Sequence, residues 1–383
     1  MGGNLNPGAG AAPLPPLDRA PPEVGAVTDY EPLARERMTA GAWAYISGGA
    51  TDEVTLRRNR AAFDELRLQN RILADVRAGD TRLELFGRRY DFPVLLAPVA
   101  YLKLAHPDGE LAAARGAAAA GAGLVLSTHA STTLEDVAAQ AKSDRLWFQL
   151  YAKPDRGFTR ELVARAEAAG YSALVVTLDA PVNGHRNREP RVGYRLPPGI
   201  EAANLRGMAP LPAYRGGSGS PLCGGILESA LTWDDFEWLR SLTRLPLLLK
   251  GVIAPEDAAR AVDLGADGLI VSNHGGRTLD TLPASIEALP PIAAQVQGRV
   301  PLLLDSGVRR GTDILKAVAL GAAAVLIGRP YVFGLAAAGA PGVAHVIQIL
   351  RAELEVAMGL TGCRNLAGIT RRVFWNPADY GKP

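Results

Sequence analysis

Polar and charged side chains stand at the ends of a series of short apolar runs in this sequence. A buried polar group that stays unpaired costs about 1 to 3 kcal/mol, so several of them at one place predict a bound ligand. Each alone could be an ordinary loop residue after a strand, but an anionic, hydrogen-bonding cofactor and an anionic substrate would account for all of them together. They are Ser127, Gln149, Tyr151, Thr177, Asp179, Lys250, Ser272, His274, Asp305 and Arg329.

Two further segments, 305–311 (DSGVRRG) and 327–330 (IGRP), combine glycine with arginine. Glycine lets the backbone approach a ligand closely, and Arg309 and Arg329 supply charged hydrogen-bond donors. The segments therefore predict a phosphorylated cofactor. Tight turns with solvated arginines are the alternative.

Eight short apolar runs, separated by stretches with helical periodicity, predict the elements that position these side chains. Parallel strands covered on both faces have this nearly continuous apolar character. Eight strand and helix units in about 250 residues predict a (β/α)8 TIM barrel, whose site lies at the carboxyl ends of the strands. A doubly wound open sheet is the alternative, but no GxGxxG motif follows the first run. The runs are 93–100, 121–128, 145–151, 172–181, 245–251, 265–273, 300–306 and 322–330, and helices are predicted over 109–121, 158–170, 255–265 and 310–321.

The connection between the fourth and fifth runs, 183–244, is too long for an ordinary barrel loop. Its part 187–225 is rich in Gly, Pro and Arg, which predicts an irregular lid loop over the barrel mouth. Residues 1–25, rich in Gly, Ala and Pro, predict a disordered tail. We expect the barrel domain over 26–370 and a C-terminal tail over 371–383.

Composition and charge exclude several classes of protein. A formal net charge of +2, from 41 basic and 39 acidic residues, does not indicate the excess of positive charge that nucleic-acid-binding proteins have. The two cysteines, Cys223 and Cys363, have no metal-ligand spacing and fit a reducing compartment, so we expect no metal and a cytoplasmic location. No apolar run appears long enough to span a bilayer and no signal peptide is visible, so we expect no membrane association.

Several longer motifs follow one another along the chain. They are 45–50 (YISGGA), 97–100 (APVA), 147–151 (WFQLY), 177–179 (TLD), 249–252 (LKGV), 272–277 (SNHGGR) and 305–313 (DSGVRRGTD). In this order they resemble the FMN-dependent 2-hydroxy-acid oxidases and dehydrogenases, the family of glycolate oxidase, lactate oxidase and mandelate-oxidising enzymes. The resemblance runs from about residue 29 to about residue 365, and motifs of this length are highly specific.

The resemblance implies an active-site base and an orienting carboxylate. It makes His274 the base, with Asp179 bonded to the far ring nitrogen, where it would orient the imidazole and stabilise the imidazolium. The pairing suits general-base catalysis near neutral pH.

The resemblance also implies the groups that bind the substrate. Arg277 would clamp the substrate carboxylate, a bidentate role for which lysine is a poor substitute. Arg186 falls at the position of the family's second arginine, with Arg188 as a competitor. Tyr45 and Tyr151 would hydrogen-bond the substrate.

The cofactor implied is FMN. Lys250 would place positive charge beside the N1 and O2 edge of the flavin ring. Pro98, Val99 and Ala100 would line one face of the ring. The remaining cofactor contacts implied are Ser127, Gln149, Thr177 and Ser272 near the ring, Asp305 at the ribityl chain, and Ser306, Gly307, Arg309, Gly328 and Arg329 at the phosphate.

The implied reaction moves two electrons from the α-carbon of a small (S)-2-hydroxy acid to FMN and yields the 2-oxo acid. Ala100 stands where the family's oxidases tend to have alanine, which favours O2 as the acceptor and H2O2 as a product. A dehydrogenase using another acceptor, and a different FMN barrel enzyme of a biosynthetic pathway, are the alternatives. Because family members are often tetramers, we expect a homo-oligomer.

Some positions depart from the family pattern. His129 stands where a Trp or Tyr that contacts the substrate is common, Val99 replaces a common Thr, and Ser306 replaces the commoner Gly of the phosphate loop. Tyr101 follows a segment most like the mandelate-type oxidases. We expect Tyr101 and His129 to face the substrate, and we expect that substrate to be aromatic or otherwise bulky.

Overall fold

The structure, a computed structural model, describes residues 12–208 and 230–375. Eight parallel strands close into a barrel, because Val325 of the last strand lies in register with Val94 of the first. The strands are β3 (Val94–Leu96), β4 (Gly123–Ser127), β5 (Leu146–Leu150), β6 (Ala173–Thr177), β7 (Leu247–Val252), β8 (Gly268–Val271), β9 (Leu302–Leu304) and β10 (Ala324–Ile327). Each overlaps one of the eight predicted runs. The TIM-barrel prediction is confirmed, and the open-sheet alternative is wrong.

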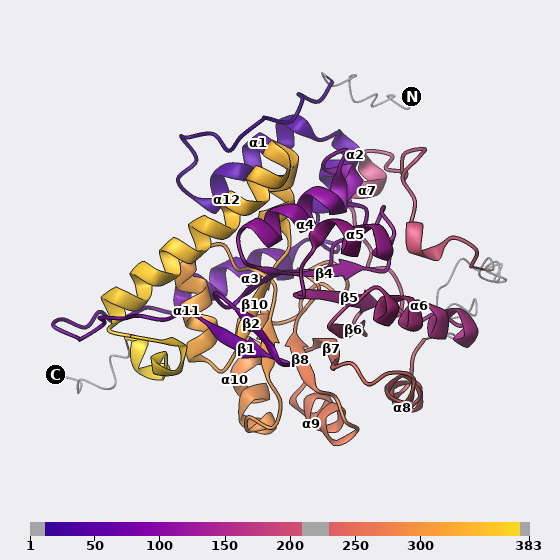
Figure 1. The fold of residues 1–383 in the computed structure, drawn as a ribbon. Coiled ribbons are helices and arrows are strands. Elements are labelled where there is room, and N and C mark those ends of the chain that lie inside the picture. The colour runs from indigo at the N-terminus through magenta and orange to yellow at the C-terminus, as the bar shows by residue number, and fades with distance from the viewer. Residues whose placement is uncertain (1–11, 209–229, 376–383) are drawn as a thin grey trace, which may run out of the picture.

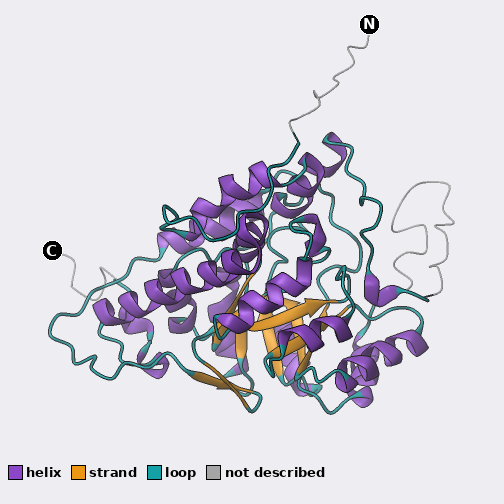
Figure 2. Ribbon diagram, turned by 45° about the horizontal axis from the view of Figure 1, so that its top comes forward, coloured by secondary structure: helices purple, strands orange, loops and turns teal. Residues whose placement is uncertain are grey.

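Helices surround the barrel (Figure 2). They are α4 (Gly109–Ala119), α5 (Leu134–Ala141), α6 (Arg156–Ala168), α8 (Trp233–Leu242), α9 (Pro255–Asp263), α10 (Ser285–Val296), α11 (Gly311–Ala319) and α12 (Arg329–Thr361). The four predicted helices are confirmed as α4, α6, α9 and α11. Thr133 and Asp155 begin α5 and α6 by accepting hydrogen bonds from backbone N–H groups of the first turn.

A hairpin closes the amino-terminal end of the barrel. Its strands are β1 (Leu83–Leu85) and β2 (Arg88–Tyr90). Phe86 and Tyr90 pack edge-on against Trp147, with ring centroids 5.7 and 6.5 Å apart, and Trp147 is fully buried inside the barrel. This end is therefore filled with apolar side chains, which leaves the carboxyl ends of the strands for polar chemistry.

Helix α12 corrects one expectation. By length and composition it could cross a membrane, although the sequence appeared to hold no such run. Its most apolar window is 67% buried, and it packs on α1 (Tyr30–Arg37), α4 and α11 (Figure 1). Non-helical dihedral angles at Ala338 and Gly339 also break it, and a side chain at Gly339 would meet His106 Nε2 at 3.0 Å. Its burial and its break are those of a helix of the protein core.

The two predicted tails contact the fold where they are described. Residues 12–25 lie against the fold: Leu17 N–H donates to the carbonyl of Ala337, and Val24 is buried. These contacts tie parts of this segment to the fold, whereas residues 1–11 lie outside the described residues, so the disordered tail stays a prediction. At the other end, Val373 is buried and accepts a hydrogen bond from Gln69 N–H. The packing of the domain thus extends past residue 370.

The described part of the predicted lid 187–225, residues 187–208, contains two short helices, α7 (Arg188–Arg191) and η3 (Ala203–Leu205), in otherwise irregular chain. Residues 209–229 lie outside the described part of the structure. The chain before the barrel forms α1, α2 (Ala40–Ser47) and α3 (Val54–Glu65).

Asp280, in the loop after β8, caps helix α3 from a distance. Its Oδ1 accepts from Thr55 N–H at 2.8 Å. Its Oδ2 accepts from the Thr51 hydroxyl at 2.8 Å and from the N–H groups of Asp52 and Val54 at 3.1 Å. A carboxylate at a helix N-terminus is favourable because it pairs with N–H groups that lack helical partners. Burial acts to raise the pKa of Asp280, but these donors hold it well below its ordinary value.

We expect Asp280→Asn to destabilise the protein by about 1.5 to 3 kcal/mol, because hydrogen bonds to a charged acceptor are lost. A carboxyl whose folded pKa is lowered stabilises the fold above its unfolded pKa of about 4 and stops doing so as pH falls through the lowered value. Urea unfolding at a series of pH values checks this: the gap between variant and wild type should shrink in acid. Asp75→Asn, which removes an exposed ion pair with Arg77, is the control. An equal loss of unfolding free energy in Asp280→Asn and Asp75→Asn would contradict the prediction.

Candidate active site

A cavity of about 970 Å³ opens at the carboxyl ends of the strands. Nearly all of the predicted site residues line it, and they come from the ends of all eight strands and from α2. They are Tyr45, Pro98, Val99, Ala100, Ser127, His129, Gln149, Tyr151, Thr177, Arg186, Lys250, His274, Arg277, Asp305, Ser306, Gly307, Arg309, Gly328 and Arg329. Asp179, Ser272 and Tyr101 lie one layer behind, against His274, Lys250 and His129 respectively.

His274 and Asp179 form a directed pair. His274 Nδ1 lies 2.8 Å from Asp179 Oδ1, so Nε2 is the ring nitrogen left for a ligand. Burial acts to raise the pKa of Asp179, but the charges on His274 and Lys250 lower it below its ordinary value. An ionised carboxylate on Nδ1 fixes the tautomer and stabilises a proton taken up at Nε2. This geometry is that of a general base.

The loop carrying His274 is pinned by side-chain hydroxyls. The backbone of His274 is left-handed, with φ of 57°, and its N–H donates to Ser272 Oγ at 3.0 Å. The next N–H, of Gly275, donates to Ser306 Oγ at 2.9 Å. Ser306 itself has φ of 73°, the region that favours glycine, which agrees with its replacing a family glycine. Its hydroxyl also donates to Asp305.

Arg277 lies beside the base with only part of its guanidinium used. Nη1 donates to the carbonyls of Tyr45 and Gly48, the latter at 3.0 Å. The guanidinium carbon is 5.0 Å from the centre of the Tyr45 ring, and that of Arg186 is 5.6 Å from the same ring. Burial lowers the pKa of Arg277. Two guanidinium groups around one tyrosine, in a cavity, form a site for an anion such as a carboxylate.

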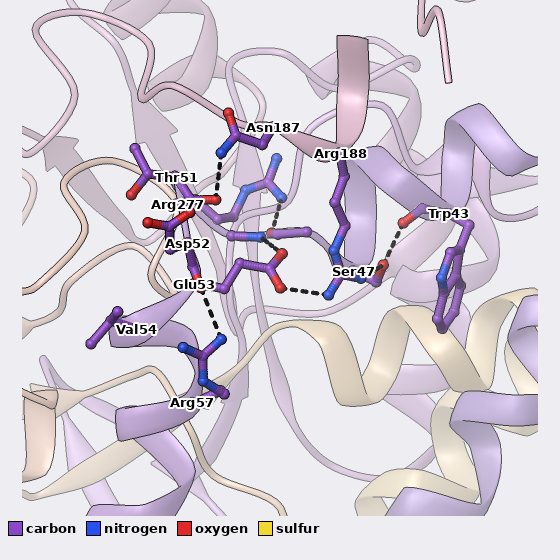
Figure 3. Close-up of polar contacts among 12 residues, drawn as sticks. Trp43, Ser47, Thr51, Asp52, Glu53, Val54, Arg57, Asn187, Arg188 and Arg277 are labelled. Carbon is purple, nitrogen blue, oxygen red and sulfur yellow. Dashed lines mark hydrogen bonds and ion pairs between the residues drawn. The ribbon is translucent and has the colours of Figure 1, made fainter. Parts of the chain in front are cut away.

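Arg188, the competitor of Arg186, points away from the cavity. Its Nη2 pairs with Glu53 Oε2 at 2.6 Å and its Nη1 lies 3.2 Å from Ser47 Oγ (Figure 3). Glu53 Oε1 accepts from Gly49 N–H at 2.9 Å. Asn187 adds a bond to the carbonyl of Thr51. Arg188 therefore fastens the segment after β6 to the turn between α2 and α3, whereas Arg186 lines the cavity.

We expect Arg186→Met to raise KM about 10- to 100-fold, because a charge-assisted contact to the substrate is lost. The matched variant Arg188→Met should change KM much less and should lower thermal stability instead. Steady-state kinetics together with thermal unfolding of both variants check the assignment. A larger rise of KM in Arg188→Met would reverse it.

Three rings stack at one side of the cavity. The His129 ring lies between Tyr101 and Tyr151, with centroids 6.1 and 5.1 Å away and interplanar angles of 6° and 26°. Tyr101, which is half-buried, also packs against Tyr45, with ring centroids 6.2 Å apart, so its contact with the substrate stays a prediction. Burial raises the pKa of Tyr151 to about 12, so its hydroxyl stays protonated at neutral pH.

Lys250 and Gln149 present polar groups deep in the cavity. Lys250 Nζ donates to Ser272 Oγ at 2.9 Å and pairs with Asp305 Oδ2 at 3.2 Å. Burial acts to lower the pKa of Lys250, but Asp305 and Asp179 raise it above its ordinary value. Gln149 Oε1 accepts from Ser127 Oγ, while its buried Nε2 has no partner among the described residues. An orphaned buried donor and a charged lysine lining the same cavity call for a ligand with an acceptor edge.

The two arginines predicted at the phosphate, Arg309 and Arg329, also line the cavity. Burial, together with the charge of Arg60, lowers the pKa of Arg309 to about 10. Arg329 is bound differently: its nitrogens donate to the carbonyls of Ile46, Gly275 and Gly48 at 3.0, 2.9 and 2.6 Å. Arg309 therefore has more of its guanidinium available to bind a phosphate. Arg329 instead joins the loop that carries His274 to the end of α2.

Comparison with known proteins gives the same answer as the motifs. Residues 34–376 match the family described as FMN-dependent dehydrogenase. The chain belongs to this family. It is 50% identical over 347 residues to an L-lactate oxidase of Nostoc sp., covering 89% of this chain and 95% of that one. It is 44% identical over 359 residues to glycolate oxidase 1 of Oryza sativa subsp. indica, covering 93% and 97%. A solved structure of mandelate oxidase with (S)-2-phenylpropionate superposes with a TM-score of 0.83 at 41% identity, covering 92% and 98%.

Members of this family depend on FMN, and the residues present fit that cofactor. The cavity is large enough for a flavin nucleotide and still leaves room for a small acid. Gln149 Nε2 is a donor without a protein partner, and Arg309 is a buried cation. At Gly307 a side chain would meet the carbonyl oxygen of Asn59 at 2.2 Å, so glycine lets the predicted phosphate loop pack closely on α3.

Sequence reasoning missed three residues of this region. Asp280 and Glu53 act through contacts with parts of the chain far away in sequence, for which no local pattern exists. Lys153 stands two residues beyond Tyr151, past the end of β5, and it lines the cavity. Its position just after a strand end was the signal that could have found it.

Proposed function

We propose that this protein oxidises (S)-2-hydroxy acids to 2-oxo acids with FMN and passes the electrons to O2, which yields H2O2. The observation that carries the proposal is one cavity holding an oriented His274–Asp179 pair beside two arginines, Arg277 and Arg186. A base and a carboxylate clamp are the groups needed to take a proton from a carbon or oxygen next to a carboxylate. The names lactate oxidase, glycolate oxidase and mandelate oxidase among the relatives support it.

The roles of the residues follow from their places. Arg277 and Arg186 bind the substrate carboxylate, and the protonated Tyr151 hydroxyl hydrogen-bonds the substrate. His274 takes a proton at Nε2, and Asp179 stabilises the imidazolium that results. Tyr45 contributes its ring to the arginines and its hydroxyl to the substrate.

FMN, when bound, supplies the two-electron acceptor. Lys250, Gln149, Ser127 and Thr177 would hold the polar edge of its ring, and Pro98, Val99 and Ala100 one face. Lys250 would favour negative charge on that edge. Asp305, Gly307, Arg309 and Gly328 would hold the ribityl phosphate, while Ser272, Ser306 and Arg329 fix the loops around it.

The acceptor and the assembly rest on sequence resemblance, and the location rests on the cysteine content. Ala100 favours O2 over other acceptors, and the two named oxidases among the relatives support that choice. A homotetramer and a cytoplasmic location stay predictions. A biosynthetic FMN enzyme acting on another substrate is the competing function, and it gives no reason for Arg277 beside the base.

Anaerobic mixing of the purified holoenzyme with a panel of (S)-2-hydroxy acids tests the proposal. At least one acid should bleach the flavin absorbance, and admitting air should restore it with formation of H2O2. If no acid bleaches the bound flavin, the function is wrong. Bleaching with slow recovery in air would replace the oxidase by a dehydrogenase with another acceptor.

A further inference from the structure

Lys153 and His129 form a polar pair in the wall of the cavity. Lys153 Nζ lies 3.2 Å from His129 Nε2 and 5.8 Å from the centre of the Tyr151 ring. Both side chains line the cavity that holds His274 and Arg277. The pair therefore stands beside Tyr151, in the wall of the cavity that holds the His274 base and the Arg277 guanidinium.

The contact fixes the protonation state of the imidazole. Burial and the charge of Lys153 lower the pKa of His129 to about 4, so His129 is neutral at neutral pH. A lysine ammonium can only donate, so His129 Nε2 accepts from it and the ring proton sits on Nδ1. Lys153 keeps two further N–H groups that this bond does not use.

Lys153 is held in place but not neutralised. Its backbone N–H donates to Thr159 Oγ1 at 2.8 Å, and its carbonyl accepts from the same hydroxyl at 3.2 Å. Over residues 12–208 and 230–375 no carboxylate forms an ion pair with its Nζ; in contrast, the buried Lys250 is paired with Asp305. A largely buried cation without a counter-ion is costly unless a ligand supplies one.

We propose that Lys153 is a specificity-determining residue that binds a second carboxylate, at the end of the substrate side chain, so that the preferred substrates are 2-hydroxy dicarboxylic acids. This inference rests on the proposed function and narrows its substrate class. Arg277 and Arg186 take the carboxylate next to the hydroxyl, and Lys153 takes the distal one across the cavity. The distal carboxylate would stand in place of the aromatic substrate group expected from the sequence. Tyr101, on which that expectation rested, stacks on His129.

A pair of acids of equal shape tests the proposal. (S)-Malate carries a distal carboxylate where (S)-2-hydroxy-4-methylpentanoate carries an isopropyl group. Wild type should have the higher kcat/KM for malate. Lys153→Met should lower the ratio of kcat/KM for malate to kcat/KM for the isopropyl acid about 10- to 100-fold, because one charge-assisted hydrogen bond is lost. Lys153→Arg should restore most of it, and Lys142→Met, a lysine at the end of α5 away from the cavity, should not change it.

A binding measurement separates this inference from the proposed function. Succinate and 4-methylpentanoate lack the hydroxyl group, and their binding perturbs the absorbance of bound flavin without turnover. Their Kd ratio should favour succinate in wild type and fall in Lys153→Met by the same factor. An unchanged ratio, or a wild-type preference for the isopropyl acids, overturns the role of Lys153. If both hydroxy acids fail to bleach the flavin while the Kd ratio shifts as expected, the proposed function falls and the carboxylate site stands.

Discussion

Replacing His274 by alanine is expected to slow anaerobic reduction of the bound flavin about 100- to 10,000-fold, the range that a positioned general base contributes. The physical reason is the loss of Nε2, the nitrogen left facing the cavity while Asp179 holds Nδ1 at 2.8 Å. Stopped-flow absorbance with a saturating substrate checks this, because it isolates the reductive step from binding and from oxygen.

The control for this variant is His185→Ala. His185 is an exposed residue after β6 that the structure uses only through its backbone carbonyl, which accepts from Thr51 N–H. The flavin bound to the His185→Ala variant should be reduced at the wild-type rate. His274→Ala should retain FMN at the wild-type stoichiometry, since no cofactor contact is assigned to its ring. A His274→Ala protein that holds FMN and is reduced at the normal rate would remove His274 from the chemistry.

Arg277→Met is expected to lower kcat/KM by about 30- to 5,000-fold, which corresponds to the roughly 2 to 5 kcal/mol lost when one partner of a buried charged contact is removed. Nη1 is already committed to the carbonyls of Tyr45 and Gly48, so the rest of the guanidinium meets the substrate. Arg277→Lys should recover little, because a point charge cannot replace two parallel donors.

The sharpest readout for Arg277 compares an acid with its primary amide. Wild type should prefer the carboxylate strongly, and Arg277→Met should lose that preference. If the preference survives in Arg277→Met but is lost in Arg186→Met, the two arginines have exchanged roles. If the preference for the carboxylate is retained in both variants, neither Arg277 nor Arg186 binds the carboxylate.

The barrel could be predicted because its strands are buried on both faces. Such strands have nearly continuous apolar runs, and β4, β5 and β6 appear in the sequence as 121–128, 145–151 and 172–181. The predicted runs extend beyond the strands, because residues such as Leu178 remain apolar after the last paired residue, Thr177. Apolar character reports burial, whereas the strand ends where the hydrogen-bonded ladder ends.

The sequence could predict which residues make up the site but not which contacts they make. Polar residues at strand ends share one rim, which brings His274 and Asp179 together from 95 positions apart. Nothing local signals that Asp280 caps α3 or that Glu53 pairs with Arg188, since those partners are joined only by the finished fold. The surroundings of Tyr101 have no local signal either: its backbone is left-handed, with φ of 56°, and its ring stacks on His129.

The turn between α2 and α3 also constrains when the protein becomes an enzyme. The carbonyls of Tyr45, Ile46 and Gly48 receive Arg277 and Arg329, which lie 232 residues after Tyr45 and 283 residues after Ile46 respectively. During synthesis the carbonyl of Tyr45 cannot receive Arg277 until β8 has been made, and that of Ile46 cannot receive Arg329 until the last strand has been made; contacts so distant in sequence form late. A nascent chain that stops short of Arg329 therefore holds most of a barrel and no working catalyst.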